Sequence, residues 1–222
     1  LRLAEGRVAA VRNAVGPDVD ILVEAHAKFN VATAIQIGKR LEQYEPTFYE
    51  EPVSYELVAE MADVRNRVDI PIATGERLYH KYDFYELIEA HAVDFLQPDI
   101  CNAGGITELK KIAAMAEAYY VGIQPHNPYG PINTMAALQL DACTPNFMIQ
   151  EGGHHPWFDE IVVGEFPKQV DGYFDLPTGP GIGLNMDEEA LRANPPVEIH
   201  PPEGYVKAGR SAWGSKQQTM WS

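Results

Sequence analysis

Six short apolar runs in this chain each lead into an ionisable residue, and these residues recur at a nearly constant interval. They are Glu24, Glu50, Glu76, Asp99, His126 and Glu151. The steps between them are 26, 26, 23, 27 and 25 positions. Helical periodicity fills the intervals, and we expect helices over residues 3–15, 32–41, 57–68, 83–90, 106–119 and 132–143. Strands and helices that alternate at a regular step predict a parallel βα array.

Two architectures fit such an array: a doubly wound open sheet and a (β/α) barrel. An open sheet usually concentrates its site at one switch point. Here every unit carries an ionisable residue at the carboxyl end of its strand, and a barrel brings all those ends to one mouth. The pattern therefore favours the barrel. Because such a barrel closes with about eight strands and six are visible, two βα units are expected to precede Leu1.

The first three strand ends carry glutamates, Glu24, Glu50 and Glu76. Buried together, three carboxylates would repel one another, and a hard divalent cation would relieve that conflict. Magnesium prefers oxygen ligands, so we interpret the three as Mg²⁺ ligands. A lone strand-end glutamate is more often a solvated residue or the partner of an arginine. Alternation along a strand would turn Glu51 away from Glu50, so Glu50 is assigned as the ligand.

Two histidines are expected in the same mouth. His26 follows Glu24 by two positions, and residues i and i+2 of a strand face the same side. His126 ends a strand next to the strand of Asp99, and neighbouring strands lie about 4.8 Å apart. An Asp99–His126 hydrogen bond is therefore expected, and it would orient the imidazole. Glu151 could contact a reacting intermediate or could be an ordinary loop residue. For His154 and His155 a surface loop is the favoured reading.

The composition excludes several classes of partner. The chain of 222 residues is 45% apolar, enough for a core, and its formal net charge of -15 argues against nucleic acid or an anionic membrane as a partner. No apolar run approaches the roughly 18–20 residues that span a bilayer. The two cysteines, Cys101 and Cys143, have no zinc spacing, so reduced thiols in a cytoplasmic protein are expected.

Seven segments together resemble the mandelate racemase subgroup of the enolase superfamily, and within it the galactonate and gluconate dehydratases. The segments are EAH at 24–26, FYEEPV at 48–53, PIATGERLY at 71–79, QPD at 97–99, AGGITE at 103–108, PHNP at 125–128 and IQE at 149–151. The likeness extends over residues 1–190. It implies a modified (β/α)7β barrel of the TIM type, here without its first strands and without the N-terminal α+β capping domain of the family. Residues 191–222 are expected to form a C-terminal extension.

The resemblance implies Mg²⁺-dependent dehydration of a sugar acid to a 2-keto-3-deoxy acid. His126, oriented by Asp99, would remove the α-proton, His26 would protonate the leaving hydroxyl, and Glu151 would stabilise the intermediate. Glu24 departs from the family, which usually has Asp at that position. Racemisation or epimerisation and a non-catalytic incomplete barrel are the alternatives. The expected partner is a small sugar acid, and relatives often form octamers or smaller rings, so a homo-oligomer is expected.

Overall fold

The computed structural model describes residues 1–153 and 155–195. The strands are short: β1 (Leu22–Glu24), β2 (Phe48–Glu50), β3 (Ile72–Thr74), β4 (Phe95–Leu96) and β5 (Gly122–Ile123). The helices are α1 (Arg2–Val15), α2 (Val31–Leu41), α3 (Val58–Arg65), α4 (Lys81–Glu89), α5 (Gly105–Glu117), α6 (Pro131–Asp141), α7 (Phe158–Ile161) and α8 (Glu188–Ala193). A 3-10 turn, η1 (Glu42–Tyr44), follows α2.

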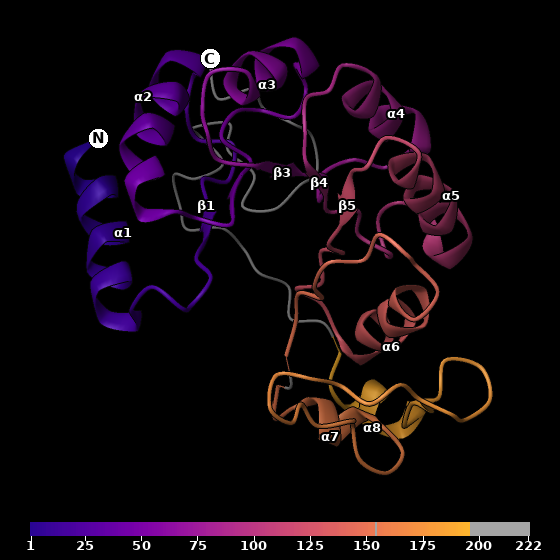
Figure 1. Ribbon diagram of the computed structural model, residues 1–222. Helices are drawn as coiled ribbons and strands as arrows, with labels where there is room; N and C mark the ends of the chain where they lie inside the picture. The colour runs from indigo at the N-terminus through magenta and orange to yellow at the C-terminus, as the bar shows by residue number, and fades with distance from the viewer. Residues whose placement is uncertain (154, 196–222) are drawn as a thin grey trace, which may run out of the picture.

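The five strands form one parallel sheet in the order β1-β2-β3-β4-β5. Sequential order with a helix between neighbours is the topology of a (β/α) barrel wall, and Figure 1 shows α1 to α5 in an arc around the outside of the sheet. The predicted parallel βα array is confirmed. The expected sixth strand at 147–149 is reduced to a single bridge between Phe147 and Ile123.

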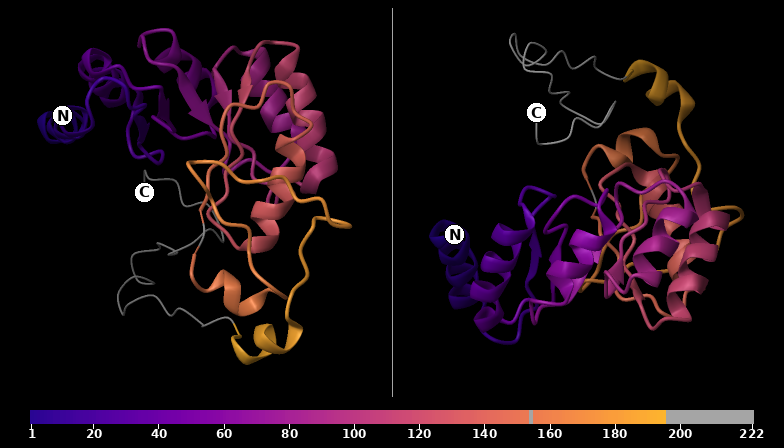
Figure 2. Two further views of the ribbon diagram at one scale, coloured as in Figure 1. Left: turned by 60° about the horizontal axis from the view of Figure 1, so that its bottom comes forward. Right: turned by 90° about the horizontal axis from the view of Figure 1, so that it is seen from above.

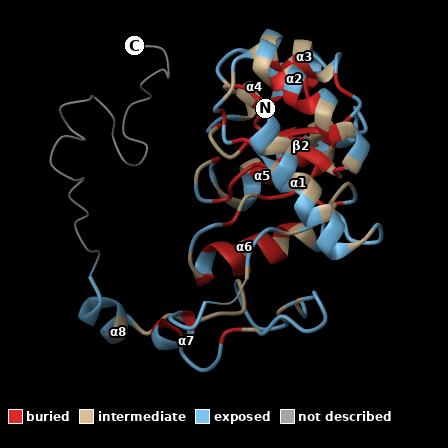
Figure 3. Ribbon diagram, turned by 90° about the vertical axis from the view of Figure 1, so that its left-hand side faces the viewer, coloured by how far each residue is buried: buried red, intermediate tan, exposed pale blue. Residues whose placement is uncertain are grey.

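The main core lies between the sheet and this arc of helices, where the buried residues gather (Figure 3). α2 illustrates how the sequence produces it. Asn30 caps its N-terminus by accepting a hydrogen bond from the Thr33 amide at 2.8 Å. Its apolar stripe then buries Ala34, Ile37 and Leu41. The helices are thereby held on one side of the sheet, and the loops after each strand are free to carry chemistry.

Beyond residue 151 the chain leaves the barrel wall. A second, smaller core joins α6 to the following segment through Met135, Leu138, Phe158, Val162 and Phe166. α7 packs against α6 through this core, and both α7 and α8 lie away from the strands (Figures 1 and 2). The expected C-terminal extension lies outside the described residues from 196 onward, as does His154. Among the residues described, none of the helices has the length and apolar character needed to cross a membrane.

Candidate active site

Three carboxylates meet where the first three strands end. Glu24 and Glu50 are paired in register as the last residues of β1 and β2, and Glu76 lies two residues beyond β3. One carboxylate oxygen from each lies within 4.8 Å of the others. The three strand-end glutamates that the sequence singled out are therefore close enough to share an ion.

The chemistry of this donor set fits a hard divalent cation. Burial raises the pKa of Glu24, and so do the hydrogen bond with Glu50 and the negative charge of Glu50. Burial likewise raises the pKa of Glu50, to which the charges of Glu76 and Glu151 add. Carboxylates that resist ionising because of one another become stable ligands once a cation lies between them. Three carboxylate oxygens with room for water or substrate are the donors that Mg²⁺ takes in enzymes.

A histidine–aspartate pair lies beside this cluster. Asp99 is fully buried, and its Oδ1 accepts hydrogen bonds from the amides of Cys101 at 2.7 Å and Asn102 at 3.1 Å. Its Oδ2 lies 2.7 Å from Nδ1 of His126, so the expected hydrogen bond is present. The opposite ring nitrogen, Nε2, lies 3.2 Å from Oε2 of Glu76. Although burial lowers the pKa of His126, the hydrogen bond to Asp99 and the charges of Glu76 and Glu151 raise it overall.

His26 reaches the same place by a route that alternation did not predict. β1 ends at Glu24, and His26 and Ala27 adopt left-handed backbone angles, with φ of 53° and 55°. Nδ1 of His26 lies 3.7 Å from Oε1 of Glu76 and 3.9 Å from Oε1 of Glu24. Burial and the charge of Arg77 lower its pKa. The side chain is 54% exposed, so a substrate entering the mouth can reach it.

Glu151 is held at the far side of the mouth. Its Oε2 accepts a hydrogen bond from the Asn127 amide at 2.8 Å, and the side-chain amide of Asn127 donates to the Glu151 carbonyl at 3.1 Å. The charge of Glu151 contributes to the raised pKa of both His126 and Glu50. All seven predicted site residues thus gather around one mouth.

Glu51 is a correction to the expectation from the sequence. Alternation placed it away from the cluster, but β2 ends at Glu50 and Glu51 has a left-handed φ of 40°. Its side chain is fully buried and lies within 4.8 Å of Glu24 and His26. Arg77, which the sequence gave only as part of a motif, forms an ion pair with it at 3.2 Å. The sequence did contain a signal for the position of Glu51: a second acidic residue directly follows Glu50 at the end of a buried strand.

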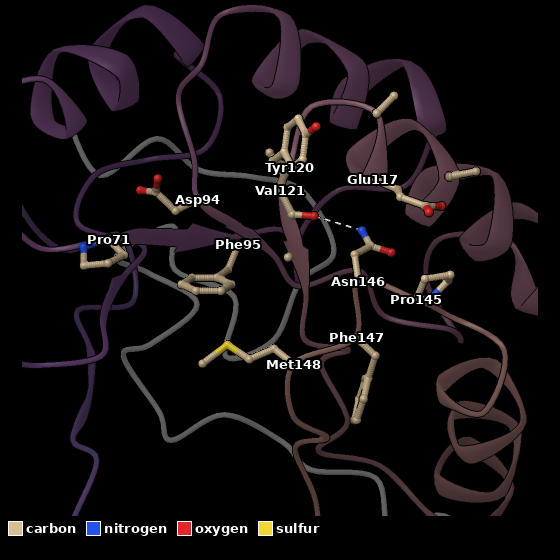
Figure 4. A pocket seen from close by; sticks show the side chains of 13 residues that line it. Pro71, Asp94, Phe95, Glu117, Tyr120, Val121, Pro145, Asn146, Phe147 and Met148 are labelled. Carbon is tan, nitrogen blue, oxygen red and sulfur yellow. Dashed lines mark hydrogen bonds between the residues drawn. The ribbon is translucent and has the colours of Figure 1, made fainter.

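A large pocket lies at the other end of the strands. It has a volume of about 1020 Å³, and Pro71, Asp94, Phe95, Phe147 and Met148 are among the residues that line it (Figure 4). Pro71 and Asp94 precede β3 and β4, so this pocket opens at the amino ends of the strands. Active sites of barrels lie at the carboxyl ends, where the carboxylates and histidines are. The pocket is therefore separate from the candidate site.

Comparisons with known proteins agree with this geometry. The family described as "Enolase C-terminal domain-like" matches residues 1–190. The D-gluconate dehydratase of Thermoproteus tenax is 40% identical over 218 residues, which cover 96% of this chain and 44% of that protein. The D-galactonate dehydratase of Cronobacter sakazakii is 39% identical over 199 residues, which cover 86% of this chain and 52% of that protein.

Solved structures show the same likeness. A mandelate racemase/muconate lactonizing enzyme from Sulfitobacter sp. superposes with a TM-score of 0.85 at 39% identity, over 89% of this chain and 50% of that one. A putative dehydratase from Mesorhizobium loti gives a TM-score of 0.81 at 34% identity, over 86% of this chain and 52% of that one. The chain spans about half the length of the curated relatives it matches.

Proposed function

The chain belongs to the enolase C-terminal domain-like family, and we propose that it carries the catalytic barrel of a Mg²⁺-dependent sugar-acid dehydratase. The substrate class is an aldonic acid of the gluconate or galactonate type, and the product is a 2-keto-3-deoxy acid. Residues 1–190 form the enolase-type barrel domain. The protein is a hydro-lyase that acts as a homo-oligomer. The names of the relatives from Thermoproteus tenax and Cronobacter sakazakii support the substrate class.

One observation carries this proposal. The Asp99–His126 pair and the Glu24–Glu50–Glu76 cluster are in direct contact, because Nε2 of His126 lies 3.2 Å from Oε2 of Glu76. A base whose free nitrogen lies at the edge of a cation site can reach the α-carbon of a carboxylate held there. Proton abstraction next to a carboxylate is the chemistry that such an arrangement serves, with a His base and bound magnesium as this superfamily is known to use.

The three glutamates would hold the cation, which when bound stabilises the negative charge that develops on the substrate carboxylate. Asp99 fixes Nδ1 of His126, so Nε2 is the nitrogen that accepts the α-proton. His26, exposed at the mouth beside Glu76, donates a proton to the β-hydroxyl as its C–O bond breaks. Glu151, held by the Asn127 amide, is placed to hydrogen-bond the intermediate.

The proton and bond changes balance over the cycle. The α C–H bond and the β C–O bond break, and one water leaves with the proton from His26. The resulting enol takes a proton at the β-carbon, releases the proton of its 2-hydroxyl group to solvent, and becomes the 2-keto-3-deoxy acid. His126 gains a proton and His26 loses one, so both return to their starting forms by exchange with solvent. General acid–base steps of this kind typically contribute about 10²–10⁴-fold each.

The test is incubation of the purified protein and MgCl₂ with a panel of aldonic acids, with 2-keto acid measured by semicarbazone formation. We expect one or a few acids to react and His26→Asn to lower kcat by about 10²–10⁴-fold. His91→Asn is the matched control, because His91 is exposed, lies after α4 and has a similar left-handed φ of 48°. Asparagine tolerates that conformation at both positions.

Three results would overturn the proposal. If His26→Asn dehydrates the true substrate at the full rate, the acid role is wrong. If no 2-keto acid forms but the substrate exchanges its α-proton with deuterium from D₂O and inverts at that carbon, the protein is a racemase or epimerase. Absence of both product and exchange with every acid of the panel would favour a non-catalytic barrel.

A further inference from the structure

Glu51 is a buried charge that the proposed reaction does not use. It follows the proposed ligand Glu50 directly and is 0% exposed. Among the described residues its side chain receives one hydrogen bond, a long one from Thr74 Oγ1 at 3.4 Å from Oε1. Its other oxygen, Oε2, is buried and lies 3.2 Å from Nε of Arg77. A fully buried carboxylate is costly unless a cation compensates it, so Glu51 fixes where the Arg77 guanidinium lies.

Arg77 connects this buried charge to a predicted metal ligand. The same Nε donates a hydrogen bond to Oε1 of Glu76 at 3.2 Å, so one nitrogen is hydrogen-bonded to Glu76 and ion-paired with Glu51. The guanidinium carbon also lies 6.0 Å from the centre of the Tyr55 ring, within the range of a cation–π contact. Its neighbour Glu76 and two residues of the segment after β2, Glu51 and Tyr55, therefore hold the guanidinium in one place.

Glu76 needs such a support because the sheet does not provide it. β3 ends at Thr74, and Gly75 turns the chain out of the strand with a φ of 150° before Glu76. With Arg77 on Oε1, the other oxygen, Oε2, faces Nε2 of His126 at 3.2 Å. The two oxygens of the carboxylate are thus distinguished: Oε1 is held by Arg77 and lies 3.7 Å from Nδ1 of His26, and Oε2 faces His126.

We infer that Glu51 and Arg77 act as a positioning pair that fixes the orientation of the Glu76 carboxylate for the cation. This inference rests on the proposed function for the identity of the site, but it concerns only how the site is held. Hydrogen-bonded partners behind a metal ligand typically change metal affinity by about 10–100-fold when removed. The pair is neither a set of ligands nor a contact for the substrate.

A second ion pair in the same fold provides the control. Arg65 at the end of α3 binds Asp94 through two nitrogens, at 2.6 Å and 3.1 Å. Like the Arg77 pair it joins residues far apart in the sequence, and its arginine is similarly exposed, 32% against 30% for the side chain. Asp94 lines the pocket at the amino ends of the strands, so Arg65 is at the opposite end from the carboxylates.

The experiment measures Mn²⁺ affinity by electron paramagnetic resonance, without substrate, in the purified protein. The variants are Arg77→Gln, Arg77→Lys, Glu51→Gln, the double variant Glu51→Gln/Arg77→Gln, Glu76→Gln as the loss of a proposed ligand, and Arg65→Gln, each with a urea denaturation curve. We expect Arg77→Gln and Glu51→Gln each to weaken Mn²⁺ binding by about 10–100-fold. The double variant should bind Mn²⁺ as tightly as the weaker-binding of the two single variants, because both changes disrupt the same pair. Arg77→Lys should restore part of the affinity, because it keeps the charge. Arg65→Gln should leave Mn²⁺ affinity within about 2-fold.

Three outcomes would overturn the inference. Unchanged Mn²⁺ affinity with a raised substrate KM in Arg77→Gln would make Arg77 a substrate contact. Loss of Mn²⁺ binding in Glu51→Gln as complete as in Glu76→Gln would make Glu51 a ligand. Equal effects of Arg65→Gln and Arg77→Gln would mean that both pairs only stabilise the fold. If Arg77→Gln does not fold, Arg77→Lys against Arg65→Lys gives the same comparison. Because Mn²⁺ affinity needs no substrate, the inference can fail or hold whether or not any aldonic acid reacts.

Discussion

Asp141, the last residue of α6, is a carboxylate in an unfavourable place. Both of its oxygens are buried and have no hydrogen-bond partner among the described residues. It also lies at the negative end of the helix dipole. Burial raises its pKa from 3.8 to about 8. Around neutral pH the folded protein therefore holds a proton there that the unfolded chain has released.

Because the folded and unfolded states bind this proton differently, Asp141 makes the stability of the protein depend on pH. Below pH 4 both states are protonated, and Asp141 has no effect on stability. Between pH 4 and about pH 8 only the unfolded chain loses the proton, so the free energy of unfolding falls as pH rises, by at most about 1.4 kcal/mol per unit. We expect Asp141→Asn to remove this loss, so the variant gains over the wild type as pH rises. Urea denaturation at pH 5, 6.5 and 8 measures it.

Asp18 gives the control, because it is an exposed aspartate in the loop between α1 and β1. Asp18→Asn removes one carboxylate without touching the core. A gain for Asp141→Asn that is equally large at pH 5 and pH 8 would show that the benefit is packing or helix propensity, and the predicted titration would be wrong.

At the level of single residues, the sequence predicted which residues lie at the candidate site better than the backbone conformation that brings each one there. The regular spacing placed Glu24, Glu50 and Glu76 correctly because each is tied to the end of a strand. Strand alternation failed for His26 and Glu51, since both lie just past a strand end in left-handed backbone. The contacts of Arg77 could not be predicted, because they depend on segments that only the folded chain brings together.

At the scale of elements, the turn after β3 decides where Glu76 lies. Gly75 has a φ of 150°, and a Cβ added there would lie 2.8 Å from the backbone nitrogen of Gln97. Backbone atoms of the neighbouring strand end cannot move aside as a flexible side chain would. We expect Gly75→Ala to cost about 1–3 kcal/mol in the free energy of unfolding and to weaken Mn²⁺ binding, because the turn must shift.

Gly6→Ala is the comparison for that prediction. Gly6 lies inside α1, where an added Cβ meets nothing within 4 Å, so alanine should stabilise the helix slightly. Chemical denaturation of both variants gives the contrast. Stability of Gly75→Ala equal to the wild type would show that the turn can adjust without strain.

The predicted helices match the observed ones because their apolar periodicity extends over many residues. The largest difference is at α3, which ends at Arg65 and not at 68, since Val68 is buried in the turn that follows. Strands of two or three residues are too short for a clear alternation of apolar and polar residues. The expected sixth strand forms a single bridge with β5.

For the whole molecule, the cation is expected to act as a crosslink between the first three βα units. Its ligands come from the ends of β1, β2 and β3, which the unfolded chain separates by 26 residues each. Binding to the folded state alone stabilises it by about 2.7 kcal/mol when the free ion is at 100 times its Kd. For a protein of this size that corresponds to a rise in Tm of about 5–10 °C. Thermal melts with MgCl₂, and with EDTA, measure it.

Glu50→Gln should abolish the rise in Tm, because Glu50 lies between the other two ligands in the sheet. Glu86→Gln, an exposed glutamate on α4, should keep it, and NaCl at matched ionic strength should not reproduce it. A rise that Glu50→Gln retains would mean that magnesium only screens the net charge of -15. The cluster would then not hold an ion, and the Mg²⁺-dependent reaction proposed for it would be wrong.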